Sequence, residues 1–313
     1  MLSRTADNLY WLSRYVERAD YLARVLEASL RVSAMPAAYS GGTNEWESAV
    51  ATAGCHGAFF KTYDEANEEN VSAFLAFSSA NPSSIRNCFE TARTNARAVR
   101  TALTSAMWDS INSAWLELKR YGNGPASRDE FANFLSWVQQ TSMLIDGSAY
   151  RTMLRNDAYW YSRLGAYIER ADNTARILDV KYHLLLPDTE KIGGPLDYFQ
   201  WAAILRSVNA LTAYHWVYRE GVKPWLVADL LILNSQMPRS LASCYDNLVR
   251  FLDQIARTHG RQGPAQRQAR AIHTRLINSR MDEIFGSGLH EFIGEFISDN
   301  NRLGAAITQQ YLV

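Results

Sequence analysis

The feature of this 313-residue sequence that most constrains its fold is an internal repeat. The segment YVERADYLARVLE begins at Tyr15 and the segment YIERADNTARILD begins at Tyr167, with eight identical positions and no gap. The two copies lie 152 positions apart, which is close to half of the chain. Recurrence of a segment at long range indicates that one structural unit occurs twice. We therefore expect two related halves, each built around a helix that carries Glu-Arg-Ala-Asp.

Other landmarks recur in the same order in both halves. Their members are Met1-Leu2 and Met153-Leu154, Gly41-Gly42 and Gly193-Gly194, Trp46 and Trp201, Pro82 and Pro238, Ser84 and Ser240, and Cys88 and Cys244. The offset between matching positions changes only from 152 to 156. This order predicts a tandem duplication, with a first half at residues 1–155 and a second half at 156–313 that together form one integrated globular unit.

The spacing of apolar residues predicts an all-α protein. Leu12, Val16 and Ala19 recur at helical intervals, as do Ile168 and Ala171, and neither half offers a convincing series of alternating strands. The expected helices span about 5–34, 44–62, 67–79, 83–121, 128–154, 157–185, 197–219, 223–235, 239–258, 265–286 and 289–311. We allow for a break inside the longest of these, and expect Asn81 to cap its first turn. The predicted fold is a helical bundle made of two tandem pseudo-symmetric halves.

Composition narrows the range of partners. Lys plus Arg and Asp plus Glu balance at 32 each, so no overall charge favours nucleic acid or an anionic membrane. No apolar run approaches the roughly 20 residues needed to span a bilayer, and the first residues lack a signal-peptide layout. The three cysteines, Cys55, Cys88 and Cys244, form no CxxC motif. An odd number of cysteines favours a reducing compartment, and we expect a cytoplasmic protein.

The repeated helix carries a charged stripe beside its apolar one. The stripe comprises Glu17, Asp20, Arg24 and Glu27 in the first half and Glu169, Asp172, Arg176 and Asp179 in the second. On an ideal helix, Arg18 and Arg170 lie on the other side. One interpretation is a set of solvated pairs, each contributing about 0.2–0.5 kcal/mol. The other is a partly buried polar centre, because Trp11, Tyr15, Trp160 and Tyr167 flank the charges.

The remaining motifs predict neither a metal nor a cofactor. The sequence contains no Glu-x-x-His pair, no zincin motif and no Gly-rich phosphate loop. Arginines suit the binding of a carboxylate or an acidic peptide. The candidate substrate-binding side chains are Arg18, Asp20, Arg24, Arg97, Arg155, Arg170, Asp172 and Arg176. Glu17 and Glu169 are the candidate catalytic residues.

Taken together, the motifs resemble those of the bacterial alpha-E family, which is named for a helical domain with a Glu-Arg motif. The resemblance covers essentially the whole chain and is carried by Glu17-Arg18-Ala19-Asp20, Glu169-Arg170-Ala171-Asp172, the segments NPSSI from Asn81 and NARAVR from Asn95, Met107-Trp108 with Asn112, and Met153-Leu154-Arg155 before Leu164-Gly165. An acidic residue often precedes the Met-Trp pair in that family, whereas Ala106 does so here. The resemblance implies association with a circularly permuted ATP-grasp protein and a transglutaminase-like protein.

Three functional hypotheses follow. In the first, the chain is a helical accessory subunit of an ATP-grasp amidoligase in peptide synthesis or tagging, and it holds a peptide or amino-acid substrate at the Glu/Arg centre. In the second, it is an enzyme in which Glu17 and Glu169 perform acid-base or metal chemistry together. In the third, it is a purely structural scaffold.

Overall fold

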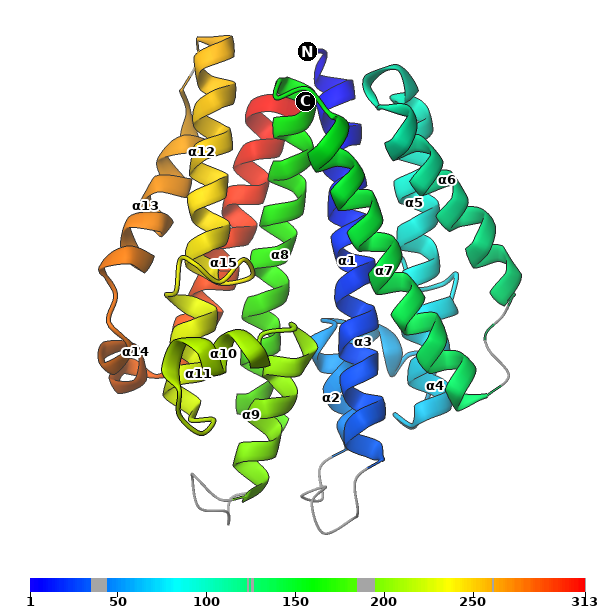
Figure 1. Cartoon of the computed structure of the whole chain (residues 1–313), viewed down its shortest axis with the longest axis vertical. Coiled ribbons are helices and arrows are strands. Elements are labelled where there is room, and N and C mark those ends of the chain that lie inside the picture. The colour runs from blue at the N-terminus through cyan, green and yellow to red at the C-terminus, as the bar shows by residue number, and fades with distance from the viewer. Residues whose placement is uncertain (35–43, 123, 125–126, 185–194, 261, 313) are drawn as a thin grey trace.

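A pair of long helices, α1 (Ser3–Ser33) and α8 (Asp157–Leu184), forms the centre of the computed structural model (Figure 1). The structure describes residues 1–34, 44–122, 124, 127–184, 195–260 and 262–312, and no side chain between 180 and 197. The two Gly-Gly pairs of the repeat lie outside these residues. Within the described residues the regular elements are all helical, which confirms the predicted fold class.

Shorter helices flank this pair on both sides. The helices that follow α1 in the chain and precede α8 are α2 (Glu45–Thr52), α3 (His56–Phe59), α4 (Glu68–Ser72), the π-helix Ala73–Phe77, α5 (Ile85–Ala98), the 3₁₀ turn Arg100–Ala102, α6 (Ser105–Leu118), the 3₁₀ turn Lys119–Tyr121 and α7 (Arg128–Thr152). After α8 these are α9 (Pro195–Ser207), α10 (Leu211–Tyr218), α11 (Pro224–Ile232), α12 (Leu241–His259), α13 (Pro264–Asn278), α14 (Met281–Ser287), α15 (Leu289–Ile307) and the π-helix Thr308–Leu312.

The two halves use their helices in the same way. α1 packs against α5 and α7, whereas α8 packs against α12 and α15, so each repeated helix is covered by two helices of its own half. The remaining face of each is turned to the other repeated helix. Residues of the predicted apolar stripes, among them Leu12, Ala19 and Ala171, are buried. This matching arrangement suits a tandem duplication, which itself stays a prediction, as does the boundary after residue 155.

Small side chains set how closely α1 and α8 approach. A Cβ atom added to Gly165 would lie 2.0 Å from the carbonyl oxygen of Tyr10, so only glycine allows this backbone contact. Beside it, the hydroxyl oxygens of Ser13 and Ser162 are 2.7 Å apart and share a hydrogen bond. The two helices are therefore in close contact just before their Glu-Arg segments.

Several expected helices are divided, each at an identifiable local signal. The range 83–121 breaks between α5 and α6, where the Thr104 hydroxyl caps the new helix by accepting from the amide of Met107. The range 44–62 breaks after Gly54, and 197–219 breaks at Asn209, both of which have positive φ. The range 265–286 likewise divides into α13 and α14.

The N-terminal caps of α5 and α12 are the two matching serines of the repeat, and Asn81 is not one of them. Ser84 caps α5 and Ser240 caps α12, each hydroxyl accepting from the backbone amide three residues later. Asn81 was the expected cap of α5, and this is wrong. Its side chain accepts instead from the amide of Ser83 in the preceding turn, which orients the chain before the helix begins. The landmark serines of the repeat are therefore its helix caps.

Candidate functional site

The repeated Glu-Arg segments exchange ion pairs across the α1–α8 interface. Arg18 donates from Nε to Oε1 of Glu169 at 2.6 Å. In the opposite direction, Arg170 donates to both carboxylate oxygens of Glu17, at 3.0 and 2.8 Å. Each arginine therefore neutralises the glutamate of the other helix, and the two pairs are related by exchange of the helices.

This exchange revises the expectation that Arg18 and Arg170 lie away from the acids. The helical angle separates Arg18 from Glu17 on their own helix, as expected. The partner helix packs in the sector between them, so an arginine on one side reaches an acid that approaches from the other helix. The four side chains therefore belong to one largely buried centre, in which both glutamates are buried and both arginines are partly exposed. The interpretation of the stripe as solvated i,i+4 pairs is wrong for Asp20 and Arg24, which are both buried.

A second arginine completes each glutamate site, and it comes from a different place in each half. Glu169 also accepts from Nε of Arg14 on α1 at 2.7 Å. Glu17 also accepts from Nη1 of Arg239, which immediately precedes the cap of α12, at 2.8 Å. The residue matching Arg239 in the first half is Ser83, whose hydroxyl accepts from Arg18 at 3.3 Å.

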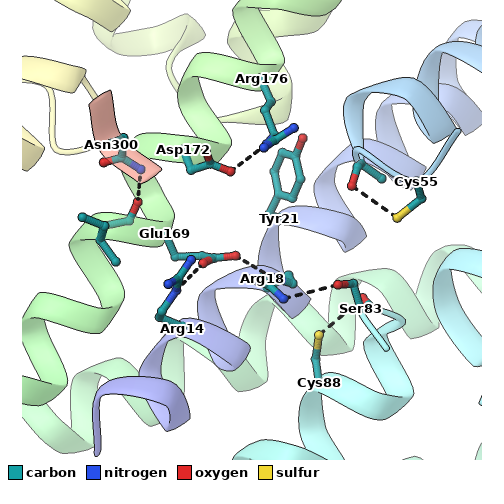
Figure 2. A network of polar contacts seen from close by, with 12 residues as sticks. Arg14, Arg18, Tyr21, Cys55, Ser83, Cys88, Glu169, Asp172, Arg176 and Asn300 are labelled. Carbon is teal, nitrogen blue, oxygen red and sulfur yellow. Dashed lines mark hydrogen bonds and ion pairs between the residues drawn. The ribbon is translucent and has the colours of Figure 1, made fainter. Parts of the chain in front are cut away.

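The aspartates of the two repeats differ in their partners. Asp20 accepts from Arg24 at 2.8 Å and from Nη2 of Arg239 at 2.7 Å, and it is almost fully buried. Asp172 accepts from Arg176 alone at 2.6 Å, and its Oδ1 atom has no hydrogen-bond partner within the described part of the chain. Figure 2 shows the charged residues around Glu169. Arg14 and Arg18 converge on Glu169, while Asp172 and Arg176 lie further along α8. The serine at position 83 therefore leaves Asp172 without the second arginine that Asp20 has.

The electrostatics of these groups follow from burial and pairing. Burial alone would raise the pKa of Glu17, but the charges of Arg170 and Arg239 hold it well below its usual value. Burial likewise opposes the ionisation of Glu169, and Arg14 and Arg18 outweigh it, so its pKa is also lowered. For Asp172 burial dominates over Arg176, and its pKa is raised. Both glutamates are therefore held as carboxylates.

A general acid at neutral pH needs a pKa raised toward 7, which neither glutamate has. The arginines of the centre therefore keep both glutamates ionised. No group of three or more His, Cys, Asp or Glu side chains within the described ranges has the arrangement needed to hold a metal ion.

Two of the predicted ligand-binding arginines lie elsewhere. Arg97 is exposed on α5. Arg155 is exposed before α8, where its guanidinium lies over the ring of Tyr159 at 4.0 Å from the ring centroid and donates to the carbonyl oxygen of Tyr150. Neither arginine belongs to the Glu-Arg centre.

A cavity of about 180 Å³ adjoins the Glu17 side of the centre. This first cavity lies between α1, α7 and α8, and its apolar wall includes Leu12, Val16, Met107 and Met143. Its charged lining consists of Glu17, Asp20, Asp146, Arg163, Arg170 and Arg239. Acids and arginines are equal in number, so the lining is close to neutral overall.

Three residues that line the first cavity carry buried polar atoms without a partner. These atoms are Oδ1 of Asp20, Oγ of Ser142 and Nε of Arg163, and none forms a hydrogen bond to any described residue. Arg163 is buried between the rings of Tyr159 and Tyr167 and pairs with the half-exposed Asp146. Buried polar atoms without partners are uncommon in folded proteins, and their concentration beside a cavity marks a place where a polar ligand can bind.

The residues of the Glu-Arg centre that the sequence interpretation missed are Arg14 and Arg239. Arg14 lies one helical turn before Arg18, and that spacing is the one signal that could have included it. Arg239 is distant in sequence, and its partner position in the repeat is a serine. Only the packing of α12 against α8 brings it to Glu17.

The fold and the centre together define an all-helical protein organised around a buried carboxylate–guanidinium cluster. The chain belongs to the Alpha-E family, whose model matches residues 1–312 and is described as a predicted alpha-helical domain with a conserved ER motif. In this sequence the Glu-Arg dipeptide occurs at Glu17-Arg18 and at Glu169-Arg170, the residues that exchange ion pairs. No curated protein and no solved structure matches the chain. Among the described residues, no helix combines the length and apolar character needed to cross a bilayer.

Proposed function

We propose that the chain is the helical accessory subunit of an ATP-grasp amidoligase, and that it holds an amino acid or peptide substrate in the first cavity. The observation that carries this proposal is the cavity itself, because it places arginines, acids and apolar side chains together beside the Glu-Arg centre. The ion pairs of the centre hold the charged side chains of the cavity lining in place. The ligand supplies hydrogen-bond partners for the lining atoms that have none among the described residues.

The arginines around the first cavity retain N–H groups for a carboxylate. Nη1 of Arg170 and Nε of Arg239 form no hydrogen bond with described residues, and Nε of Arg163 is buried without a partner. Arginine recognises carboxylates through paired N–H groups, and such charge-assisted hydrogen bonds are among the strongest in proteins. A substrate carboxylate is therefore expected between these three side chains.

The acids of the lining favour a ligand that also carries an amine. Glu17, Asp20 and Asp146 balance the three arginines, so a strongly anionic ligand such as a phosphate gains little from the site as a whole. A zwitterion, with one carboxylate and one ammonium group, suits a lining of mixed sign. Met107 and Met143 offer a flexible apolar surface to its side chain.

The assignment to an amidoligase system rests on the family resemblance and on chemistry. The proposal assigns ATP binding to the partner, which agrees with the lack of a Walker-type or dinucleotide-type Gly-rich loop in this sequence. Amide formation consumes a carboxylate and an amine, the two groups that the first cavity suits. The proposed partners are a circularly permuted ATP-grasp protein and, in the same system, a transglutaminase-like protein.

Binding to the first cavity is tested by calorimetric titration with free amino acids and dipeptides. Arg163→Gln removes a guanidinium from the cavity and should weaken binding about tenfold or more. Arg155→Gln, an exposed arginine outside the centre, is the matched control and should leave affinity unchanged. If no amino acid or dipeptide binds saturably, the substrate-holding part of the proposal is wrong.

The partnership is tested by co-expression with a circularly permuted ATP-grasp protein encoded beside the chain. We expect the two to co-purify, and we expect the rate of ATP-dependent amide formation to fall when the helical chain is omitted. The absence of a complex, together with an unchanged ligase rate, would reject the partnership and favour a structural scaffold.

A further inference from the structure

A second cavity, of about 220 Å³, lies on the other side of the Glu-Arg centre. It is bounded by α1, α8 and α15, and Trp11, Arg14, Ile168 and Gly304 are among its lining residues. Arg14 connects it to the centre, because its Nε atom donates to Glu169.

The second cavity occupies the place in the second half that the first cavity occupies in the first. Positions 152 apart line both, with Ile168 matching Val16 and Trp11 matching Arg163. Each cavity is closed by the long helix that ends its half, through Gly147 of α7 in one and Gly304 of α15 in the other. The fold therefore provides two equivalent cavities with different side chains.

The charges of the two linings differ in kind. Arg14 is the one charged side chain among the described residues that line the second cavity, whereas acids and arginines balance in the first. Its Nη2 atom forms no hydrogen bond with described residues, and its Nη1 atom makes only a long one of 3.4 Å to the Tyr10 hydroxyl. A lining with a single, mostly buried arginine favours an anionic group.

Part of the remaining lining of the second cavity is suited to an apolar body. The indole of Trp11 lies under the Arg14 guanidinium, 4.7 Å from the ring centroid, which fixes the orientation of both groups. Ile168 and Ala305 add aliphatic surface. The uncharged polar groups of the lining belong to Asn300, Asn301 and Thr308. An apolar cavity of about 150 Å³ accommodates benzene in an engineered protein, so this volume is sufficient for a small ring.

We propose that the second cavity is a separate binding site for a monocarboxylate with a small apolar or aromatic body, with Arg14 holding the carboxylate. This proposal goes beyond the proposed function and does not depend on it. The chain would then hold two chemically different ligands, one on each side of its Glu-Arg centre.

The test uses benzoate as the probe and benzyl alcohol as its uncharged counterpart. Titration calorimetry of the full chain should show saturable binding of benzoate, with benzyl alcohol weaker by about tenfold or more because it lacks the charge that Arg14 recognises. The proposal is overturned if benzoate does not saturate, or if the two probes bind equally well.

Matched glycine variants locate the site. Gly304→Leu places a side chain in the second cavity and should abolish benzoate binding, whereas Gly147→Leu fills the first cavity and should leave benzoate binding unchanged. Gly304→Ala is a milder second variant, since its added Cβ would meet its nearest neighbours at ordinary contact distances of 3.8 and 3.9 Å. It should weaken benzoate binding while retaining the native circular dichroism spectrum.

The same variants separate this proposal from the proposed function. Gly147→Leu should abolish amino-acid binding without affecting benzoate, and Gly304→Leu should do the reverse. Benzoate binding that survives both Gly304 variants, or that is lost in Gly147→Leu, assigns the probe to another place and rejects the second site.

Discussion

Gly165 of α8 lies directly against the backbone of Tyr10 of α1, with room for a hydrogen atom and nothing larger. One helical turn further along each helix lie Glu169 and Arg14, which form an ion pair. The close approach of the two backbones thus determines whether the short reach of a glutamate is enough to meet the arginines of the opposite helix. The glycine and the charged centre are one structural arrangement.

Gly165→Ala should destabilise the protein strongly. Its Cβ would lie 2.0 Å from a backbone oxygen, so the helices must separate, and we expect a loss of about 3 kcal/mol or more in the free energy of unfolding. Urea unfolding measures this loss. The control is Gly294→Ala, at an exposed helical position where the Cβ meets nothing within 4 Å, which should gain up to about 1 kcal/mol. Equal effects of the two variants would contradict the close contact.

Glu169→Gln should also cost stability, because it leaves Arg14 and Arg18 without a countercharge in a buried place. Removing one member of a buried ion pair typically costs about 3–5 kcal/mol. The matched control is Glu27→Gln, which should cost about 1 kcal/mol or less because its ion-pair partner Arg31 is exposed and its other partner, Gln139, is uncharged. The midpoint of urea unfolding distinguishes the two. A Glu169→Gln variant as stable as the control would mean that this carboxylate does not balance the two arginines.

The sequence predicted the two central helices because their apolar spacing and their repetition agree. The charged centre was predicted only in part. Glu17 and Glu169 are visible as a repeated pattern, but their partners depend on which helix packs against which, and that is a tertiary property. Arg239 shows the limit most clearly, since it is 222 residues from Glu17 along the chain. No local pattern connects the two.

Helix boundaries were less predictable than helix existence. The break at Asn209 requires a left-handed residue that is not glycine, and the apolar pattern continues through it. The cap at Thr104 was not expected, because the helical periodicity continues on both sides of it. In both places a short-range backbone preference outweighs a longer apolar pattern.

Stability should decline in acid, chiefly through Glu17 and Glu169. Their pKa values are lower in the folded chain than in the unfolded chain, where a glutamate titrates near about 4.3. Their contribution is therefore complete above that pH and is lost as the pH falls toward the folded values. Unfolding free energies measured from pH 7 to pH 3 should fall less steeply for Glu17→Gln than for the native chain. Parallel curves would contradict the lowered pKa.

Asp172 should act in the opposite direction. Burial raises its folded pKa, so the unfolded chain releases this proton first, and stability is lost as the pH rises through the interval above about 3.9. Lowering the pH through that interval restores the loss and offsets part of the decline caused by the glutamates. Asp172→Asn should therefore make the acid decline steeper, measured by urea unfolding over the same pH range. A shallower decline would show that Arg176 outweighs burial.

The three cysteines should differ widely in their reactivity toward iodoacetamide at pH 8. Burial raises the pKa of Cys88 and of Cys244 to about 12, so a fraction on the order of 10⁻⁴ of each is thiolate, and both side chains are fully buried. Cys55 is partly exposed, and the nearby charges of Arg18 and Arg176 offset some of the rise that burial causes in its pKa. We expect one fast equivalent of alkylation at Cys55, identified by peptide mass, with the other two reacting only as the chain unfolds.

Cys55→Ser should remove the fast phase, and full denaturation should make the three react alike. Labelling of Cys88 or Cys244 at the rate of Cys55 in the native chain would mean that α5 or α12 does not pack as tightly as described.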